Sequence, residues 1–162
     1  MLFRSFIGTL GKALGCQGGF VAGPRVLIEL VLNRARTFIY TTALAAPVAA
    51  AAEAALRLVE QEPERRATLQ ALAQRLHRHL VSLGVASPAS PSHIQPVIIG
   101  SARGAVDVAD RLWARGSWAP AIRPPTVPER TARLRLSLTA LHTPAQIDEL
   151  AEGLRAVLPR RA

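Results

Sequence analysis

A leucine repeat places the strongest constraint on how this chain folds. It lies between two helix-breaking residues, Pro63 and Gly84. Its members recur at three- and four-residue intervals and are Leu69, Leu72, Leu76, Leu80 and Leu83. This spacing puts all the leucines on one face of an α-helix, and a glycine directly after it suits a helix C-terminal cap. The sequence therefore predicts a helix with one apolar face that must be buried against another layer.

The neighbouring segments predict the elements that could form this layer. An alanine-rich helix is expected from Pro47 to Glu60, ending before Pro63 because proline clashes with the preceding turn. Downstream we expect a short strand over Ile94–Gly100 and a helix over Ala105–Arg115. A further strand is expected over Arg133–Thr139, where every second residue from Leu134 to Leu138 is a leucine on one face.

The start of the last helix has the clearest sequence signal. Thr143 can cap it, Pro144 suits the first helical position, and Gln146 completes a capping box. From residue 45 the expected order is helix, helix, strand, helix, strand, strand, helix. This order predicts an α/β fold in which helices cover a small, mostly antiparallel sheet.

The first 44 residues have a different character, with many glycines and short apolar runs. We expect strands over Gly18–Gly23 and Thr37–Thr41, and a helix over Val26–Arg34 between them. Two isolated strands cannot hide their edges or bury both faces, so this segment is expected to come from a larger sheet. The sequence thus predicts one domain portion over 1–44 and a small α/β domain over 45–162.

Composition excludes several classes of protein. With 49% hydrophobic residues, the chain is too apolar for a disordered tail. The net charge of +9 could indicate a nucleic-acid binder, but the arginines are scattered and lack interleaved aromatics, which argues against that class. The apolar, uncharged run Thr37–Ala52 contains Pro47 and is shorter than the ~20 apolar residues of a membrane-spanning helix. No nucleic-acid or membrane partner is therefore expected.

Cysteine and histidine usage argues against metal sites and disulfides. Cys16 is the one cysteine, which excludes an intrachain disulfide and fits a reducing, cytoplasmic location. His77 and His79 are expected on the helix face away from the leucines, and the other two histidines are isolated, so no metal site is expected.

Lys12 is the one lysine among twenty basic residues and lies in the glycine-rich run Gly8–Gly15. Arginine can replace lysine on a surface but cannot serve as an amine nucleophile. A P-loop is excluded, because only Thr9 and Leu10 separate Gly8 from the Gly-Lys pair and Ala13 follows it. The remaining readings are a surface loop or a lysine that carries a cofactor.

The segment around Lys12 resembles the cofactor-lysine motif of the α-oxoamine synthases, fold-type I pyridoxal-phosphate enzymes in which a threonine precedes the lysine by three residues. Three later segments resemble the same family in the same order, and together the resemblance covers nearly the whole chain. They are Phe38-Ile39-Tyr40-Thr41-Thr42, His93-Ile94-Gln95-Pro96-Val97-Ile98 and the tract from Ala121 to His142. The segment Ile122-Arg123-Pro124-Pro125-Thr126-Val127-Pro128 resembles sequences of the oxononanoate synthase branch more than those of the 5-aminolevulinate synthase or glycine acyltransferase branches.

The resemblance implies a fold, a cofactor and a reaction. It implies the C-terminal part of a fold-type I enzyme, with a remnant of the large cofactor domain and the small C-terminal domain. The cofactor would be pyridoxal 5′-phosphate, bound by Lys12, and the reaction would condense L-alanine with a pimeloyl thioester, with decarboxylation, in biotin synthesis. The acyl carrier, coenzyme A or a carrier protein, stays open. The family also implies a homodimer.

The resemblance assigns roles position by position. Thr9 would bind the cofactor phosphate, while Thr41 and Thr42 would reach the phosphate in the partner subunit. Arg123 would hold a substrate carboxylate, and Thr126 would line the same site. Without the resemblance, Thr41 and Thr42 would be interpreted as ordinary strand residues and Arg123 as a solvated surface charge.

The resemblance also implies an incomplete cofactor site. In the family, the residues that stack on the cofactor and pair with its ring nitrogen precede the lysine, and the chain corresponds to less than half of a family subunit. We therefore expect a fragment of such an enzyme. A folded, non-catalytic association module is the alternative. Arg133 and Arg135, on the polar face of their strand, could meet an acyl-carrier partner, but we favour solvent.

Overall fold

The computed structural model of the chain describes residues 5–85 and 92–158. Their contacts divide the chain into two compact units, unit 1 (residues 1–63) and unit 2 (residues 64–162). The contacts thus separate the units after the alanine-rich helix, whereas the sequence placed a domain boundary before it, at residue 45. The expected domain assignment concerns a larger fold and stays a prediction.

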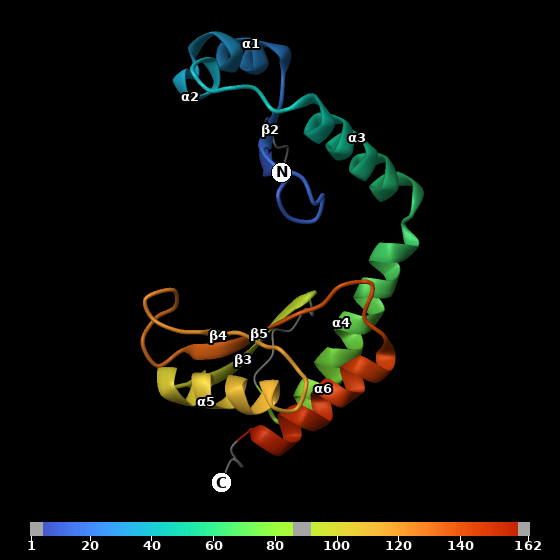
Figure 1. The fold of residues 1–162 in the computed structure, drawn as a ribbon, viewed down its shortest axis with the longest axis vertical. Helices are drawn as coiled ribbons and strands as arrows, with labels where there is room; N and C mark the ends of the chain where they lie inside the picture. Colours follow the sequence, from blue (N-terminus) through green and yellow to red (C-terminus); the bar gives the residue numbers. More distant parts are fainter. Residues whose placement is uncertain (1–4, 86–91, 159–162) are drawn as a thin grey trace. The chain divides into compact units, whose positions relative to one another are not determined.

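Unit 1 contains a β-hairpin and three helices (Figure 1). Strands β1 (Phe6–Thr9) and β2 (Gly19–Ala22) pair antiparallel, with Ile7 opposite Val21 and Thr9 opposite Gly19. Helices α1 (Arg25–Arg34), α2 (Arg36–Ile39) and α3 (Ala46–Gln61) follow. The strand expected at Gly18–Gly23 and the helices expected at Val26–Arg34 and Pro47–Glu60 are confirmed.

The strand expected over Thr37–Thr41 is wrong. Residues 36–39 form the short helix α2, closed by the Tyr40 N–H donating to the Arg36 carbonyl oxygen at 3.0 Å. The Thr41 hydroxyl donates to the Thr37 carbonyl oxygen at 2.5 Å, one helical turn back. Local hydrogen bonds of this kind compete with strand pairing, so β-branched and aromatic composition alone was an insufficient guide.

The described residues of unit 2 form a layer of three helices on an antiparallel sheet of three strands. Helix α4 (Glu64–Ser82) leads to β3 (Ile94–Gly100), α5 (Ala102–Trp113), β4 (Ala121–Ile122), β5 (Ala132–Ser137) and α6 (Pro144–Val157). The strand order is β3-β5-β4, with β5 in the middle (Figure 1). The predicted order of elements and the mostly antiparallel sheet are confirmed.

The leucine repeat lies where its spacing predicts. Leu72, Leu76 and Leu80 are buried in the core of unit 2, and Leu69 and Leu83 pack against it. The core also contains the three leucines from Leu134 to Leu138, whose strand alternates buried and more exposed residues. Burial of these aliphatic side chains supplies the main stabilising free energy of the unit.

The helix ends of unit 2 follow the predicted signals. Gly84 and Gly116 adopt positive φ angles of 67° and 84°, a conformation that favours glycine. Thr143 and Gln146 form both hydrogen bonds of the capping box at the start of α6. Helix α5 begins three residues earlier than expected, because the Ser101 hydroxyl accepts a hydrogen bond from the Gly104 N–H and caps it there.

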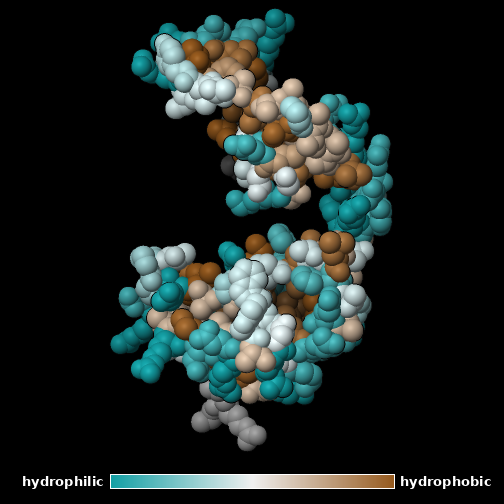
Figure 2. All heavy atoms as spheres, viewed as in Figure 1, coloured by the Kyte–Doolittle hydropathy of each residue, from teal (hydrophilic) through white to brown (hydrophobic). Residues whose placement is uncertain are grey.

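Unit 1 buries little of its apolar surface. Helix α1 contains no buried residue, and Ala52 is the one buried residue of α3. Hydrophobic side chains therefore lie at the surface of the segment that carries α1 and α3, as the brown spheres in Figure 2 show. Among the described residues, no helix has both the length and the apolar character needed to cross a membrane.

Candidate functional site

The candidate cofactor lysine lies in the loop that joins β1 and β2. The loop is closed by hydrogen bonds from the Leu10 N–H to the Gly18 carbonyl and from the Cys16 N–H to the Leu10 carbonyl, both 2.9 Å. Lys12 starts a tighter turn inside it, because its carbonyl oxygen accepts the Gly15 N–H at 2.9 Å. The sequence therefore places the chain's one amine side chain at the outer end of a hairpin.

Thr9 ends β1 and points its hydroxyl into the same loop. Its Oγ1 accepts the Gly11 N–H at 3.2 Å and donates weakly to the Gly18 carbonyl oxygen at 3.4 Å. The side chain is exposed, so the hydroxyl is open to a further hydrogen bond. Thr9 and Lys12, which the sequence predicted to act together, thus belong to one hydrogen-bonded loop.

Glycine is required at two positions of this loop. Gly15 has φ +64°, with nothing within 4 Å of where a Cβ would lie, so the backbone conformation alone selects glycine there. Gly18 has φ +102°, and a Cβ would lie 2.9 Å from the Leu44 side chain. The glycines shape a loop whose backbone a ligand can approach closely.

The residues of the loop fit the chemistry of a phosphate-bearing aldehyde. Lys12 is exposed, and none of the ion pairs among residues 5–85 and 92–158 involves it. An accessible amine is the group that condenses with an aldehyde, and a hydroxyl beside loop N–H groups can donate to a phosphate. The described loop carries both groups, and the Thr9 hydroxyl would have to exchange its weak bond to the Gly18 carbonyl oxygen to donate to a phosphate.

Thr41 lies in a bend after α2, Thr42 follows it outside any helix or strand, and both are exposed. The Thr41 hydroxyl already donates to its own helix, while its oxygen retains acceptor capacity. Their role toward a phosphate of a partner subunit stays a prediction.

Arg123 and Thr126 are brought together in unit 2 by a turn that follows β4. The Thr126 N–H donates to the Arg123 carbonyl oxygen at 3.0 Å across the cis Pro124–Pro125 peptide. Both side chains are exposed, and no described ion pair involves Arg123. A guanidinium without a carboxylate partner can bind a substrate carboxylate through two parallel hydrogen bonds.

A charged cluster between α4 and α6 was not expected from the sequence. Arg75 donates from Nε and Nη2 to the two oxygens of Asp148 at 2.7 and 2.6 Å, and His79 Nε2 lies 2.8 Å from Asp148 Oδ1. The hydrogen bonds from Arg75 and then His79 lower the pKa of the Asp148 carboxyl to about 2. Because the partners are 69 and 73 residues apart, no local pattern could have indicated the cluster.

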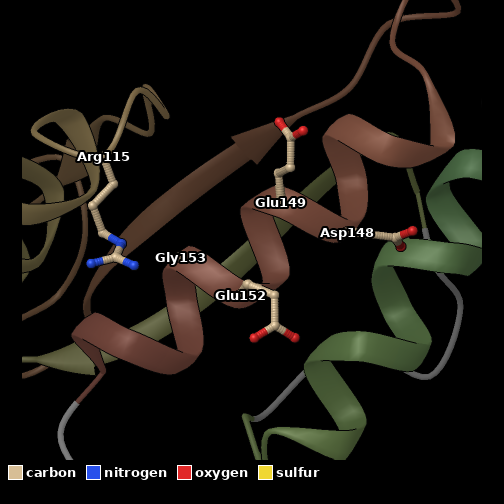
Figure 3. Close-up of a pocket in the computed structure, with 5 residues that line it drawn as sticks. All are labelled: Arg115, Asp148, Glu149, Glu152 and Gly153. Carbon is tan, nitrogen blue, oxygen red and sulfur yellow. The ribbon is translucent and has the colours of Figure 1, made fainter.

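Asp148 also borders a hollow of about 520 Å³ along α6, shown in Figure 3. Glu149, Glu152, Gly153 and Arg115 complete its lining. Figure 3 shows the Asp148 carboxylate directed toward α4, where its oxygens meet Arg75 and His79. We therefore interpret the cluster as a structural tie between two helices. Within the described residues, no group of histidine, cysteine or acidic side chains is arranged to hold a metal ion.

The matches to known proteins extend over both the loop that contains Lys12 and unit 2. The model of the family described as aminotransferase class I and II matches residues 5–154. An 8-amino-7-oxononanoate synthase from Nitrosococcus oceani is 51% identical over 152 residues, which is 94% of this chain and 40% of that protein. The chain thus spans about 40% of the length of the curated relatives it matches.

The chain also matches part of the length of related proteins whose structures have been solved. The chain superimposes with a TM-score of 0.88 on a K265A serine palmitoyltransferase from S. paucimobilis with a bound PLP–myriocin aldimine, at 30% identity, covering 95% of this chain and 39% of that one. An 8-amino-7-oxononanoate synthase structure from Francisella tularensis gives a TM-score of 0.81 at 28% identity, covering 93% of this chain and 44% of that one.

Proposed function

Because the chain belongs to the aminotransferase class I and II family, we propose that it forms the lysine-bearing C-terminal portion of a pyridoxal-phosphate-dependent 8-amino-7-oxononanoate synthase. Its fold is that of the C-terminal portion of fold-type I pyridoxal-phosphate enzymes, and related proteins use this cofactor. The reaction we assign to the complete enzyme is the decarboxylative condensation of L-alanine with a pimeloyl thioester, a step of biotin synthesis. A homodimer and a cytoplasmic location belong to the same proposal.

The observation that carries the proposal is the geometry of the β1–β2 loop. It combines one exposed amine, Lys12, with the Thr9 hydroxyl inside a single hydrogen-bonded turn. Bound pyridoxal phosphate supplies an electron sink that stabilises negative charge at the α-carbon of an amino acid. The protein contributes attachment, orientation and proton transfer.

Lys12 has two tasks in this proposal. Its Nζ is the group that would hold the cofactor. When not bound to the cofactor, the same Nζ would take the proton from the alanine α-carbon as a general base. Both tasks require an amine that reaches past the loop backbone, and the exposed side chain at the turn meets this requirement.

The remaining residues bind and orient. The Thr9 hydroxyl would bind the cofactor phosphate by exchanging its weak hydrogen bond to the Gly18 carbonyl oxygen for one to the phosphate. Thr42, and Thr41 once it releases the Thr37 carbonyl oxygen, would bind the phosphate held by the partner subunit. The Arg123 guanidinium binds a substrate carboxylate, and Thr126, held beside it by the turn, lines the same site. Two alternatives to this function remain. The complete enzyme could have the specificity of another α-oxoamine synthase, or the chain could be a folded portion that associates without catalysis.

A chimera tests the whole-enzyme proposal. The portion of the Nitrosococcus oceani relative that precedes its match is fused in one polypeptide to residues 5–162 of this chain. We expect the chimera to release carbon dioxide from L-alanine and a pimeloyl thioester, and the Lys12→Ala chimera to lose at least about 10³-fold in kcat. Equal activity of glycine or serine with alanine would favour another synthase specificity.

Arg123 is tested in the same chimera. Arg123→Gln keeps a hydrogen-bonding side chain but shortens it and removes its charge, so we expect KM for one carboxylate substrate to rise by roughly 10- to 100-fold. Arg135→Gln, on the exposed side of β5, provides a charge-matched comparison for the interpretation that favours solvent there. An unchanged KM in Arg123→Gln would remove that residue from the site.

A further inference from the structure

A hollow of about 320 Å³ lies on the surface of unit 2, between helix α5 and the segment that leads into β4. Both tryptophans of the chain, Trp113 and Trp118, line it. Their side chains are 66% and 76% exposed, although tryptophan usually buries most of its surface in a folded protein. Two large exposed rings at one hollow mark a surface that binds a ligand or a partner.

One wall of the hollow is a single face of α5. The residues on this face follow the three- and four-residue spacing of helical neighbours and are Val106, Ala109, Asp110 and Trp113. The helix itself is anchored by Leu112, which is fully buried in the core of unit 2. The Asp110 carboxylate and the Trp113 ring therefore belong to the same wall.

The second wall is formed by the loop that follows α5 and by the start of β4. The Ser117 N–H donates to the Leu112 carbonyl oxygen at 3.0 Å, so the chain turns back toward the helix directly before Trp118. Ala119 is buried, and the Pro120 carbonyl oxygen accepts a backbone hydrogen bond from β5 at 3.0 Å. Trp118 thus lies between two anchored backbone positions, and the fold fixes its place in the wall.

Asp110 gives the hollow a negative charge. Of the described residues that line it, Asp110 alone is ionisable, and it takes part in none of the ion pairs among residues 5–85 and 92–158. The next two arginines along the chain are directed toward α6: Arg111 donates to the Ala156 carbonyl oxygen at 3.4 Å, and Arg115 lines the hollow along α6 (Figure 3). A negative charge therefore remains beside the two rings in a chain whose net charge is +9.

Two indole rings beside a carboxylate select one class of ligand. The face of an indole ring carries negative potential, and it attracts a cation within about 6 Å of the ring centre. Quaternary and methylated ammonium ions suit such sites, because their apolar surface packs on the rings while their charge is attracted to them. Within the described part of the chain, the one cation placed over an aromatic ring is Arg36, over Tyr40, so neither tryptophan there holds a cation of the protein itself.

We propose that this hollow binds an organic ammonium ion, with the cation against the rings of Trp113 and Trp118 and its charge beside the Asp110 carboxylate. An anionic ligand would meet repulsion from that carboxylate, and a neutral apolar ligand would cover it without supplying a partner. The hollow shares no residue with the loop that carries Lys12. The proposal thus goes beyond the cofactor chemistry assigned to the complete enzyme.

Nuclear magnetic resonance of the full chain, with choline as the probe, measures this binding. The two tryptophans give two indole N–H signals, and both report on the hollow. Choline chloride replaces sodium chloride at constant ionic strength, and we expect both signals to shift with saturation and a Kd of about 1–10 mM. The neutral alcohol in which carbon replaces the choline nitrogen has the same shape, and we expect it to bind at least about fivefold more weakly.

Three substitutions separate the contribution of the rings from that of the charge. Trp113→Leu and Trp118→Leu each keep an apolar side chain but remove one ring, and we expect Kd to rise at least about fivefold, measured on the remaining indole signal. Asp110→Asn should raise Kd at least about threefold. Glu129→Gln removes the same charge from an exposed carboxylate outside the hollow, and we expect a change below about 1.5-fold. Circular dichroism checks that each variant stays folded.

Three results overturn the proposal. The first is equal binding of choline and its neutral counterpart, which would make the hollow a purely apolar site. The second is the absence of a saturable shift below about 50 mM choline in the folded chain. The third is loss of choline binding in the chimera with the preceding portion of the Nitrosococcus oceani relative, because the hollow would then be covered in the complete protein. None of these measurements depends on catalysis, so this proposal and the proposed function can fail separately.

Discussion

Leu134→Ala is predicted to be among the most destabilising single changes in unit 2. Leu134 is fully buried in β5, the middle strand, and lies opposite Val97 of β3 and Ala121 of β4 in the register. Its side chain packs in the core formed by the leucine repeat. Because strands flank it on both sides, the surroundings have little freedom to collapse into the space that the substitution leaves.

The magnitude follows from the atoms removed. The change deletes three carbons, each worth about 0.8 kcal/mol of transfer free energy, or roughly 2.4 kcal/mol. The cavity left in a well-packed core adds a further term, so we expect a loss of about 3–4 kcal/mol in the free energy of unfolding. For a domain of roughly 100 residues this lowers Tm by roughly 12–30 °C.

The assay is urea unfolding of the full chain followed by tryptophan fluorescence. Both tryptophans, Trp113 and Trp118, lie in unit 2, so the signal reports on this unit. Leu141→Ala removes the same atoms from a side chain that is 85% exposed, and we expect a change within about 0.5 kcal/mol. Equal effects of Leu134→Ala and Leu141→Ala would refute the core assignment.

The other predictions concern helix α6. Asp148→Asn should lower the free energy of unfolding of unit 2 at neutral pH, measured by urea unfolding. Because Arg75 lowers the carboxyl pKa from 3.8 to about 2, the extra stability of the wild type is full above pH 4 and falls as the pH drops toward 2. A difference between the two proteins that does not change with pH would contradict this prediction. Thr143→Ala should lower the free energy of unfolding by about 1 kcal/mol by removing the helix cap, whereas Thr143→Ser should retain most of it. Gly153→Val should lower thermal stability by about 1–3 kcal/mol, because even a Cβ would lie 3.2 Å from buried Leu112; an unchanged Tm would show that α5 yields.

Unit 2 could be predicted from sequence because its signals are local and agree with one another. The leucine spacing fixes the buried face of α4, and alternation fixes the buried face of β5. Thr143 and Gln146 mark the start of α6 by hydrogen bonds within one helical turn. Where pattern, breaker and cap point to the same element, few competing structures remain.

Unit 1 was less predictable because its apolar residues do not reveal their partners. The run Thr37–Thr41 has strand composition but forms a helical turn, and β1 was not expected at all. A five-residue apolar segment suits a strand or a helix, and tertiary partners decide between them. Many hydrophobic side chains of this unit are exposed, so burial within the unit does not decide between the two.

In the candidate site, too, residues close in sequence could be predicted and contacts between distant residues could not. Thr9 and Lys12 are three residues apart, so a short motif could indicate them, and the loop hydrogen bonds bring them into one turn. The contact of His79 with Asp148 joins residues that are distant in sequence, and only the fold revealed it. The expected roles of Thr41, Thr42 and Arg123 remain predictions for the complete enzyme.

The central claim is that Lys12 attaches the cofactor, and reduction with borohydride tests it most directly. The chimera is saturated with pyridoxal phosphate, reduced, digested and mapped by mass spectrometry. We expect a pyridoxyl group on the peptide that contains Lys12, and its loss in Lys12→Arg, which keeps the charge but not the reactive amine. Stable labelling of another amine with Lys12 unmodified would contradict the account.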